Sequence, residues 1–145
     1  MGVINTAMAA WRTVLAASPA ALTNLPENGN INDPPDTDRT YFAVLMDLDG
    51  GSTELGPEFG SGALYGDTVG IRVVVAWMKD IDDEAFAGTI ATDLENIQTT
   101  MMDDANKGTS VVLITPNGWN LDPKENWTLG TVRYRVRFRV AANLT

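Results

Sequence analysis

The sequence of 145 residues is long enough for one folded domain, and its apolar content of 44% and charged content of 20% are ordinary for a globular protein. It contains neither cysteine nor histidine, which excludes disulfides, the usual zinc sites, thiol nucleophiles and histidine acid–base chemistry. We therefore expect a protein that is not an enzyme and that has no catalytic residues, cofactor or metal. The formal net charge of −9 disfavours tight, sequence-independent binding to nucleic acid, because such binding depends on lysine and arginine.

A helix is predicted first, from Val3 to Ala17. Its large apolar residues recur at steps of four and three and form one stripe: Ile4, Met8, Trp11 and Leu15. Ser18-Pro19 marks its end, since the residue before proline avoids helical geometry. Residues 24–39 are polar and rich in proline, so we expect a long surface loop that buries little and serves a contact in an assembly.

Two strands are predicted next, joined by a hairpin loop. Tyr41–Leu48 is apolar almost throughout, which is typical of a central strand covered on both faces. Residues 50–66 contain six glycines and few side chains that can pack, so we expect this whole stretch to be a glycine-rich loop. Val69–Trp77 resumes as a strand, with Arg72 on one face and larger apolar residues on the other: Ile71, Val73, Val75 and Trp77.

A second helix is predicted from about Asp82 to Asp103. Its apolar stripe comprises Phe86, Ile90, Leu94, Ile97 and Met101. Acidic residues 82–84 fall in the first turn, where the helix dipole favours negative charge, and Lys107-Gly108 marks a stop.

The last two predicted strands differ in length. Val111–Thr115 is short and ends at Pro116-Asn117-Gly118, after which we expect a polar loop to Asn126. Thr128–Val140 alternates between two sets of side chains, so its two faces differ. One face carries Val132, Tyr134, Val136, Phe138 and Val140, and the other carries Arg133, Arg135, Arg137 and Arg139.

The elements follow the order α-β-β-α-β-β, without an internal repeat or a domain boundary. Two hairpins joined by a crossover helix predict one α+β domain over residues 1–145. We expect a mostly antiparallel four-stranded sheet with two helices on one face.

The four arginines of the last strand are the most unusual feature of the sequence. Alternate strand residues lie about 7 Å apart, where unit charges in water repel by roughly 0.6 kcal/mol. Burial of the opposite apolar face, at about 1.5–3 kcal/mol per large side chain, outweighs this repulsion. Two interpretations stay open: a solvated sheet face, and a contact with carboxylates of a neighbouring subunit. A nucleic-acid contact has less support, because no aromatic residues interleave on this face.

Carboxylates for such a contact occur in the two predicted loops. The candidates are Asp33, Asp36, Asp38, Glu54 and Glu58. Asp47-Leu48-Asp49-Gly50 also begins like a calcium-binding loop, with Glu58 at its twelfth position. The pattern fails at its fifth and sixth positions, Gly51 and Ser52, so a turn with exposed carboxylates is favoured over a metal site.

In the order, length and pattern of its elements the chain resembles the tail terminator proteins of long-tailed bacteriophages. The resemblance covers most of the chain. It is carried by the first helix, the strand Tyr41–Leu48, the final alternating strand, the acidic helix start DIDDEAF and the hairpin GGSTELGPEFGSGALYGD.

The resemblance implies a homohexameric ring that caps the tail tube and joins it to the head. The expected partners are copies of the chain itself, the tail tube protein, and head-completion or connector proteins. It also implies an axial channel, through which genome DNA passes without sequence-specific binding, and a place in the tail and neck of the virion after synthesis in the host cytoplasm. We expect no membrane partner, because no apolar run approaches the roughly 18 residues needed to span a bilayer.

Two alternatives to a tail terminator remain. Another neck or tail component, such as a head-closure or tube-related protein, would share an α+β core. A small-ligand-binding α+β module would require a concave pocket with convergent polar groups.

Overall fold

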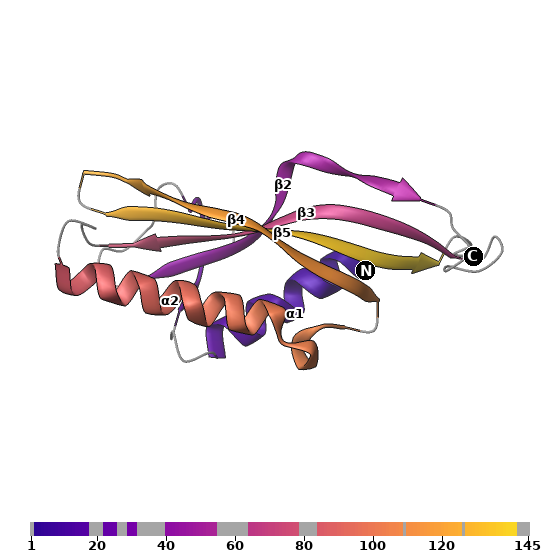
Figure 1. Cartoon of the computed structure of the whole chain (residues 1–145), viewed down its shortest axis with the longest axis horizontal. Helices are drawn as coiled ribbons and strands as arrows, with labels where there is room; N and C mark the ends of the chain where they lie inside the picture. The colour runs from indigo at the N-terminus through magenta and orange to yellow at the C-terminus, as the bar shows by residue number, and fades with distance from the viewer. Residues whose placement is uncertain are drawn as a thin grey trace.

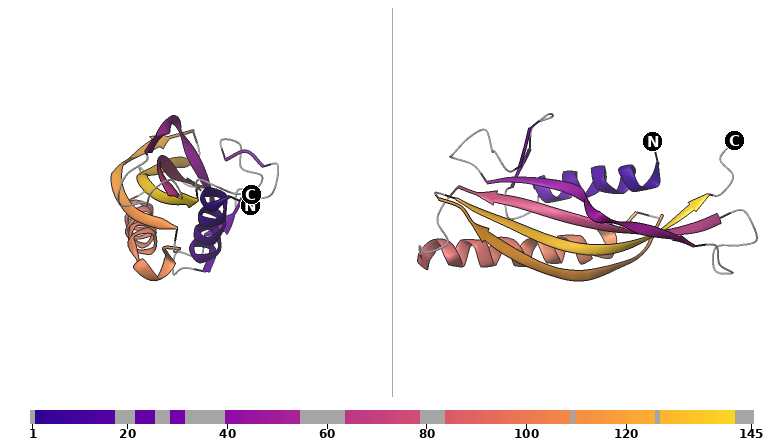
Figure 2. Two further views of the ribbon diagram at one scale, coloured as in Figure 1. Left: turned by 90° about the vertical axis from the view of Figure 1, so that its right-hand side faces the viewer. Right: turned by 90° about the horizontal axis from the view of Figure 1, so that it is seen from above.

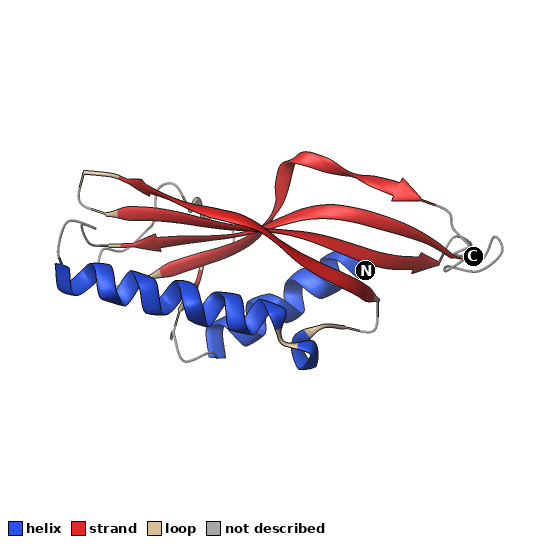
Figure 3. Ribbon diagram, in the orientation of Figure 1, coloured by secondary structure: helices blue, strands red, loops and turns tan. Residues whose placement is uncertain are grey.

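The computed structural model describes residues 2–17, 22–25, 29–31, 40–54, 64–78, 84–108, 110–125 and 127–141. Within these ranges, two long helices and four long antiparallel strands follow the order α-β-β-α-β-β, so the predicted α+β arrangement is confirmed. Both helices lie on the same face of a strongly twisted sheet (Figure 1), which is also visible from the end and from above (Figure 2). Colouring by secondary structure separates a helical layer from a strand layer (Figure 3).

The sheet has the strand order β1-β2-β3-β5-β4. Its long strands are β2 (Tyr41–Glu54), β3 (Leu64–Trp77), β4 (Val111–Pro123) and β5 (Thr128–Ala141). The two-residue β1 (Thr23–Asn24) pairs in parallel with the start of β2. The strands β3 and β5 are therefore central, and β4 forms one edge.

The helical layer consists of α1 (Val3–Ala17), α2 (Glu84–Met102) and the short 3-10 helix η2 (Asp104–Asn106). Both predicted apolar stripes are confirmed, because their members are buried or pack partly buried against the core. Of the acidic first turn that was predicted for α2, the structure describes Glu84, whereas residues 82–83 and the predicted end of α1 at Ser18-Pro19 lie outside the described residues.

The main core lies between the helices and one face of the sheet, which we call the helix face. Side chains from every long strand meet α1 and α2 there, and the largest of them are fully buried. They include Trp11, Phe42, Trp77, Tyr134 and Phe138. The predicted inward face of β5 is thus confirmed for Val132, Tyr134, Val136 and Phe138.

The opposite, outer face of the sheet has a smaller apolar cluster at one end. Tyr41, Ala43, Val74 and Ala76 are buried there, and Ile31 covers them with only 5% of its surface exposed. The expectation that residues 24–39 bury little is wrong at Ile31, and Asn24 belongs to β1. The reason is the double-sided apolar character of β2, which requires a cover on its outer face too.

The hairpin between β2 and β3 has longer strands than the sequence predicted. Residues 50–54 and 64–66, expected to be loop, are strand, and residues 51–54 pair with residues 66–69, ending at Glu54 opposite Gly66. A register shift between Met46 and Gly51 interrupts the ladder. Because β5 pairs with β3 along its full length, it extends β3 into a stretch whose own composition favours a loop.

The edge strand β4 is the second correction. It runs through the Pro116-Asn117-Gly118 sequence that was expected to end it and continues to Pro123, with a register shift between Pro116 and Trp119. Proline lacks the N–H that a ladder needs, but an edge strand has one side without a partner, so proline and a bulge are tolerated there. Gly118 adopts a φ of 88°, a left-handed conformation that favours glycine.

Phe138 tests which face of β5 is the core. It is fully buried, so Phe138→Ala should lower the free energy of unfolding by about 3–5 kcal/mol through lost burial and a cavity. The neighbouring Arg139→Ala removes an exposed side chain and should change it by no more than about 0.5 kcal/mol. Urea denaturation of both variants measures the difference. Equal, small effects would mean that the two faces are assigned the wrong way round.

Gly130 tests the close contact between β5 and β3. A Cβ at this position would lie 2.5 Å from Cζ3 of the buried Trp77, so Gly130→Ala should destabilise the protein by about 1–3 kcal/mol. A matched control is Gly88→Ala in α2, where a Cβ meets nothing within 4 Å. That change should stabilise the helix by about 0.5–1 kcal/mol. Thermal unfolding in which Gly130→Ala also stabilised would contradict the described packing of Trp77.

Candidate functional site

The arginines of β5 form a row on the outer face of the sheet, as their alternation predicted. Arg135 and Arg139 are exposed, whereas Arg133 and Arg137 are half-buried. On the neighbouring strand β3, three of them are opposed by residues without large side chains: Gly66, Thr68 and Gly70. We call these four residues, Arg133, Arg135, Arg137 and Arg139, the arginine row.

One end of the arginine row belongs to a network within the chain. Arg133 lies directly opposite Arg72 in the β3–β5 register, an arrangement of like charges that is unfavourable by itself. Arg133 donates from Nη1 to Oδ1 of Asn120 at 2.6 Å, and its Nε lies 3.9 Å from Oδ2 of Asp47. Arg72 donates from Nε to the carbonyl oxygen of Met46 at 3.2 Å. The two guanidinium groups are therefore held by acceptors on both flanking strands.

Asp47 was not predicted to contact the arginine row, and in the structure only β3 lies between its strand, β2, and β5. The register shift after Met46 changes the path of β2 at this point. Five acidic residues were predicted to contact the arginine row of a neighbouring subunit. Four of them lie outside the described residues: Asp33, Asp36, Asp38 and Glu58. Glu54 ends β2 opposite Gly66, and Gly66 pairs with Arg139 on its other side, so the backbone brings these positions into one cross-strand line.

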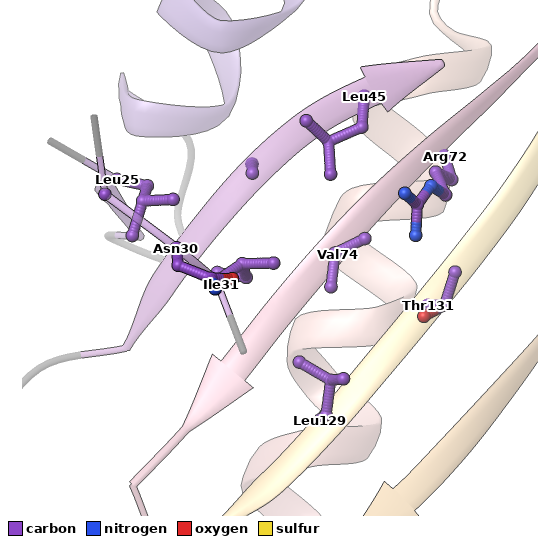
Figure 4. Close-up of a pocket in the computed structure, with 10 residues that line it drawn as sticks. Leu25, Asn30, Ile31, Leu45, Arg72, Val74, Leu129 and Thr131 are labelled. Carbon is purple, nitrogen blue, oxygen red and sulfur yellow. The ribbon is translucent and has the colours of Figure 1, made fainter. Parts of the chain in front are cut away.

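A cavity of about 280 Å³ lies on the outer face beside Arg72 (Figure 4). Its walls are apolar, from Leu45, Val74 and Leu129 on the sheet, and Ile31 with Leu25 lies across from them. Polar groups reach it from Arg72, Asn30 and Thr131. Such a mixture of apolar walls and a few polar groups is typical of small-molecule sites.

A second, larger depression lies on the helix face, where α2 runs beside the edge strand β4. It measures about 590 Å³ and is lined by Trp119 together with Ala91, Leu94, Glu95, Gln98 and Thr99 of α2. Trp119 is 54% exposed. Sequence reasoning missed this groove because it assigned Trp119 to a polar loop; a tryptophan in such a loop was the available signal.

Two polar contacts fasten α2 to the sheet inside the core. The indole N–H of Trp77 donates to Oδ2 of Asp93 at 2.8 Å, and the hydroxyl of Tyr134 donates to Oε1 of Gln98 at 3.1 Å. Burial raises the pKa of Asp93, and the hydrogen bond from Trp77 opposes part of that rise. Asp93 was also missed, although it stands three residues after Ile90 and four before Ile97, on the apolar stripe of the helix.

The described residues were compared with the requirements of a metal site and of a membrane-spanning helix. Residues 47–50, where the calcium-like pattern begins, lie within β2 rather than in a loop. No group of three or more potential metal ligands occurs in the described part of the chain. None of the helices described is both long and apolar enough to cross a bilayer.

Comparison with known proteins leaves these surfaces to be interpreted from their own chemistry. No protein-family model matches the chain, and no curated protein matches it.

Asp93 should make stability depend on pH. Its pKa is raised in the fold, so the folded state holds the proton more tightly than the unfolded state does. The free energy of unfolding should therefore fall as pH rises from the ordinary aspartate pKa of about 3.9 through the raised value. Asp93→Asn keeps an oxygen to accept from Trp77 but removes the charge, so its urea-unfolding profile between pH 4 and 8 should lack this component. Parallel profiles for the two proteins would contradict the assignment.

Proposed function

We propose that the protein is a structural virion subunit, a tail terminator that assembles with copies of itself into a ring on the tail tube of a long-tailed bacteriophage. In this role it joins the tube to the head, contacts tube and connector proteins, and catalyses no reaction. The support is the resemblance in element order and length, together with a helix–strand layering that suits side-by-side assembly. The absence of cysteine and histidine from the sequence also favours a structural role over an enzymatic one.

The observation that carries the proposal is the unequal character of the two faces of the molecule. The outer face bears the arginine row and Arg72. Acidic residues are exposed on α2 and around η2: Glu84, Glu95, Asp103 and Asp104. The described cations of this layer are engaged: Lys107 pairs with Asp104 at 3.1 Å, and Arg12 donates to the carbonyl of Val44 at 3.0 Å. Opposite charges on opposite faces favour contacts between identical copies.

One observation favours a different function, binding of a small molecule. The cavity beside Arg72 combines apolar walls with a guanidinium, as a site for a small apolar carboxylic acid would. The other alternative is another neck or tail component, and the surface features described above would suit it equally well. A terminator is expected to bind to one end of isolated tail tubes, and this binding distinguishes it from both alternatives.

Self-assembly should be visible in solution or on the tail. Multi-angle light scattering of the purified protein should give a mass that is a multiple of the subunit mass, and the protein should bind to one end of unterminated tail tubes. Added salt should weaken the assembly, because exposed charge pairs are screened. A protein that stays monomeric at all concentrations and does not bind tubes would contradict the proposal.

The arginine row provides the matched variants for this measurement. Arg135→Glu with Arg137→Glu should leave the subunit folded but weaken assembly, and Arg135→Glu alone should weaken it in part. Lys124→Glu is the matched control for the single variant, because it changes the net charge equally at an exposed site outside both the arginine row and the acidic residues of α2 and η2, and it should assemble as the wild type does. Equal behaviour of the two single variants would show that only net charge matters.

A further inference from the structure

Leu113 and Trp119 present apolar surface on opposite faces of the same edge strand. Each is 54% exposed, more than any other large apolar side chain in the described part of the chain. Leu113 pairs in register with Arg137 on the outer face. Trp119 pairs with Val132 of the core and lines the groove beside α2, so it belongs to the helix face. Two separate apolar patches therefore flank the sheet at β4.

The two patches differ in shape and in charge. Leu113 lies beside the arginine row, since Thr115 and Leu113 of β4 are opposite Arg135 and Arg137 of β5. We call Leu113, Arg135 and Arg137 the basic patch. On the helix face, the groove of about 590 Å³ has Trp119 on one side and Leu94 and Glu95 of α2 on the other. We call it the α2 groove.

The chemistry of the basic patch complements that of the α2 groove. A leucine side chain fits an apolar groove, a guanidinium stacks favourably on an exposed indole, and Glu95 offers a carboxylate to the same cation. Tryptophan and arginine are also the residue types that most often dominate the binding energy of protein interfaces. The acidic surroundings of α2 and η2 extend this charge complementarity beyond the groove itself.

Pairing of β4 with a strand of a partner is less suited to this surface. Register shifts interrupt β4 between Val111 and Leu113 and again between Pro116 and Trp119, and Pro116 has no N–H to donate. Bulges and prolines of this kind are how edge strands avoid adding a further strand. Side chains on the two faces next to the edge, rather than its backbone, are left to make the contact.

We infer that the basic patch of one copy docks into the α2 groove of the next copy. This inference rests on the self-assembly proposed above and identifies the two surfaces that meet. Because the surfaces are different, the contact is heterologous: each copy uses both, and repetition closes into a ring or continues as a filament. A contact of standard size covers about 800 Å² per partner, which is a small fraction of the 8182 Å² that the subunit exposes.

Two variants that each destroy one surface test the inference. Leu113→Asp with Arg135→Glu removes the basic patch and leaves the α2 groove intact. Trp119→Asp with Glu95→Lys removes the groove and leaves the basic patch intact. All four positions are exposed, so both variants should fold, which circular dichroism checks. Met46→Asp is the control, because Met46 is 47% exposed but lies on β2, away from both surfaces.

Sedimentation velocity of the variants, alone and mixed, gives the outcome. Each variant alone should have its self-association weakened by at least about tenfold, whereas Met46→Asp should assemble as the wild type does. An equimolar mixture of the two variants should form a one-to-one dimer and nothing larger, because one intact basic patch meets one intact groove.

Three outcomes would overturn the inference. Assembly of either variant alone like the wild type would leave the proposed function standing with a different contact. Failure of both variants to assemble alone and also to pair when mixed would indicate a symmetric or strand-paired contact. A wild-type protein that neither assembles nor binds tail tubes would overturn this inference and the proposed function together.

Discussion

The strict alternation of β5 is the constraint on which the rest of the structure depends. Val132, Tyr134, Val136 and Phe138 point into the core, so the arginines between them must point out. A slip of one residue would place the arginines under the helices, which burial of charge forbids. The alternation thus selects the face that α1 and α2 cover. As the partner of β3 and β4 along their lengths, β5 also sets the register of both.

The position of α2 on the sheet is set by a few specific contacts in the core. Gly130 makes room for the indole of Trp77, whose N–H reaches Asp93, and Tyr134 reaches Gln98. A buried carboxylate costs solvation that only a well-placed donor offsets. Together these contacts fix the position of the helix along the sheet. The same placement sets α2 beside Trp119 and so creates the α2 groove on the surface.

The sequence predicted the elements whose patterns are long and periodic. Both helices, the order of elements and the two faces of β5 follow from steps of three and four or of two, and the structure has them. The errors fall where tertiary pairing overrides local composition. Gly51 pairs with Val69 and Gly66 pairs with Glu54, in a hairpin that β5 extends by pairing with β3. The strand β4 continues through Pro116 because it lies at the edge of the sheet. Asp47 contacts Arg133 where the register of β2 shifts, and a register shift of this kind cannot be predicted from the periodicity of the sequence. The position of Trp119 beside α2 was missed because its segment was assigned to a polar loop and not to β4.

The central claim is that the basic face of the sheet is a contact surface and not merely a solvated one. A cryo-electron microscopy reconstruction of the protein assembled on tail tubes tests it most directly. The account predicts a ring of identical subunits in which Arg135 and Leu113 of each copy are buried against α2 and Trp119 of its neighbour. A ring in which the outer face of β5 is exposed to solvent in every copy would contradict it.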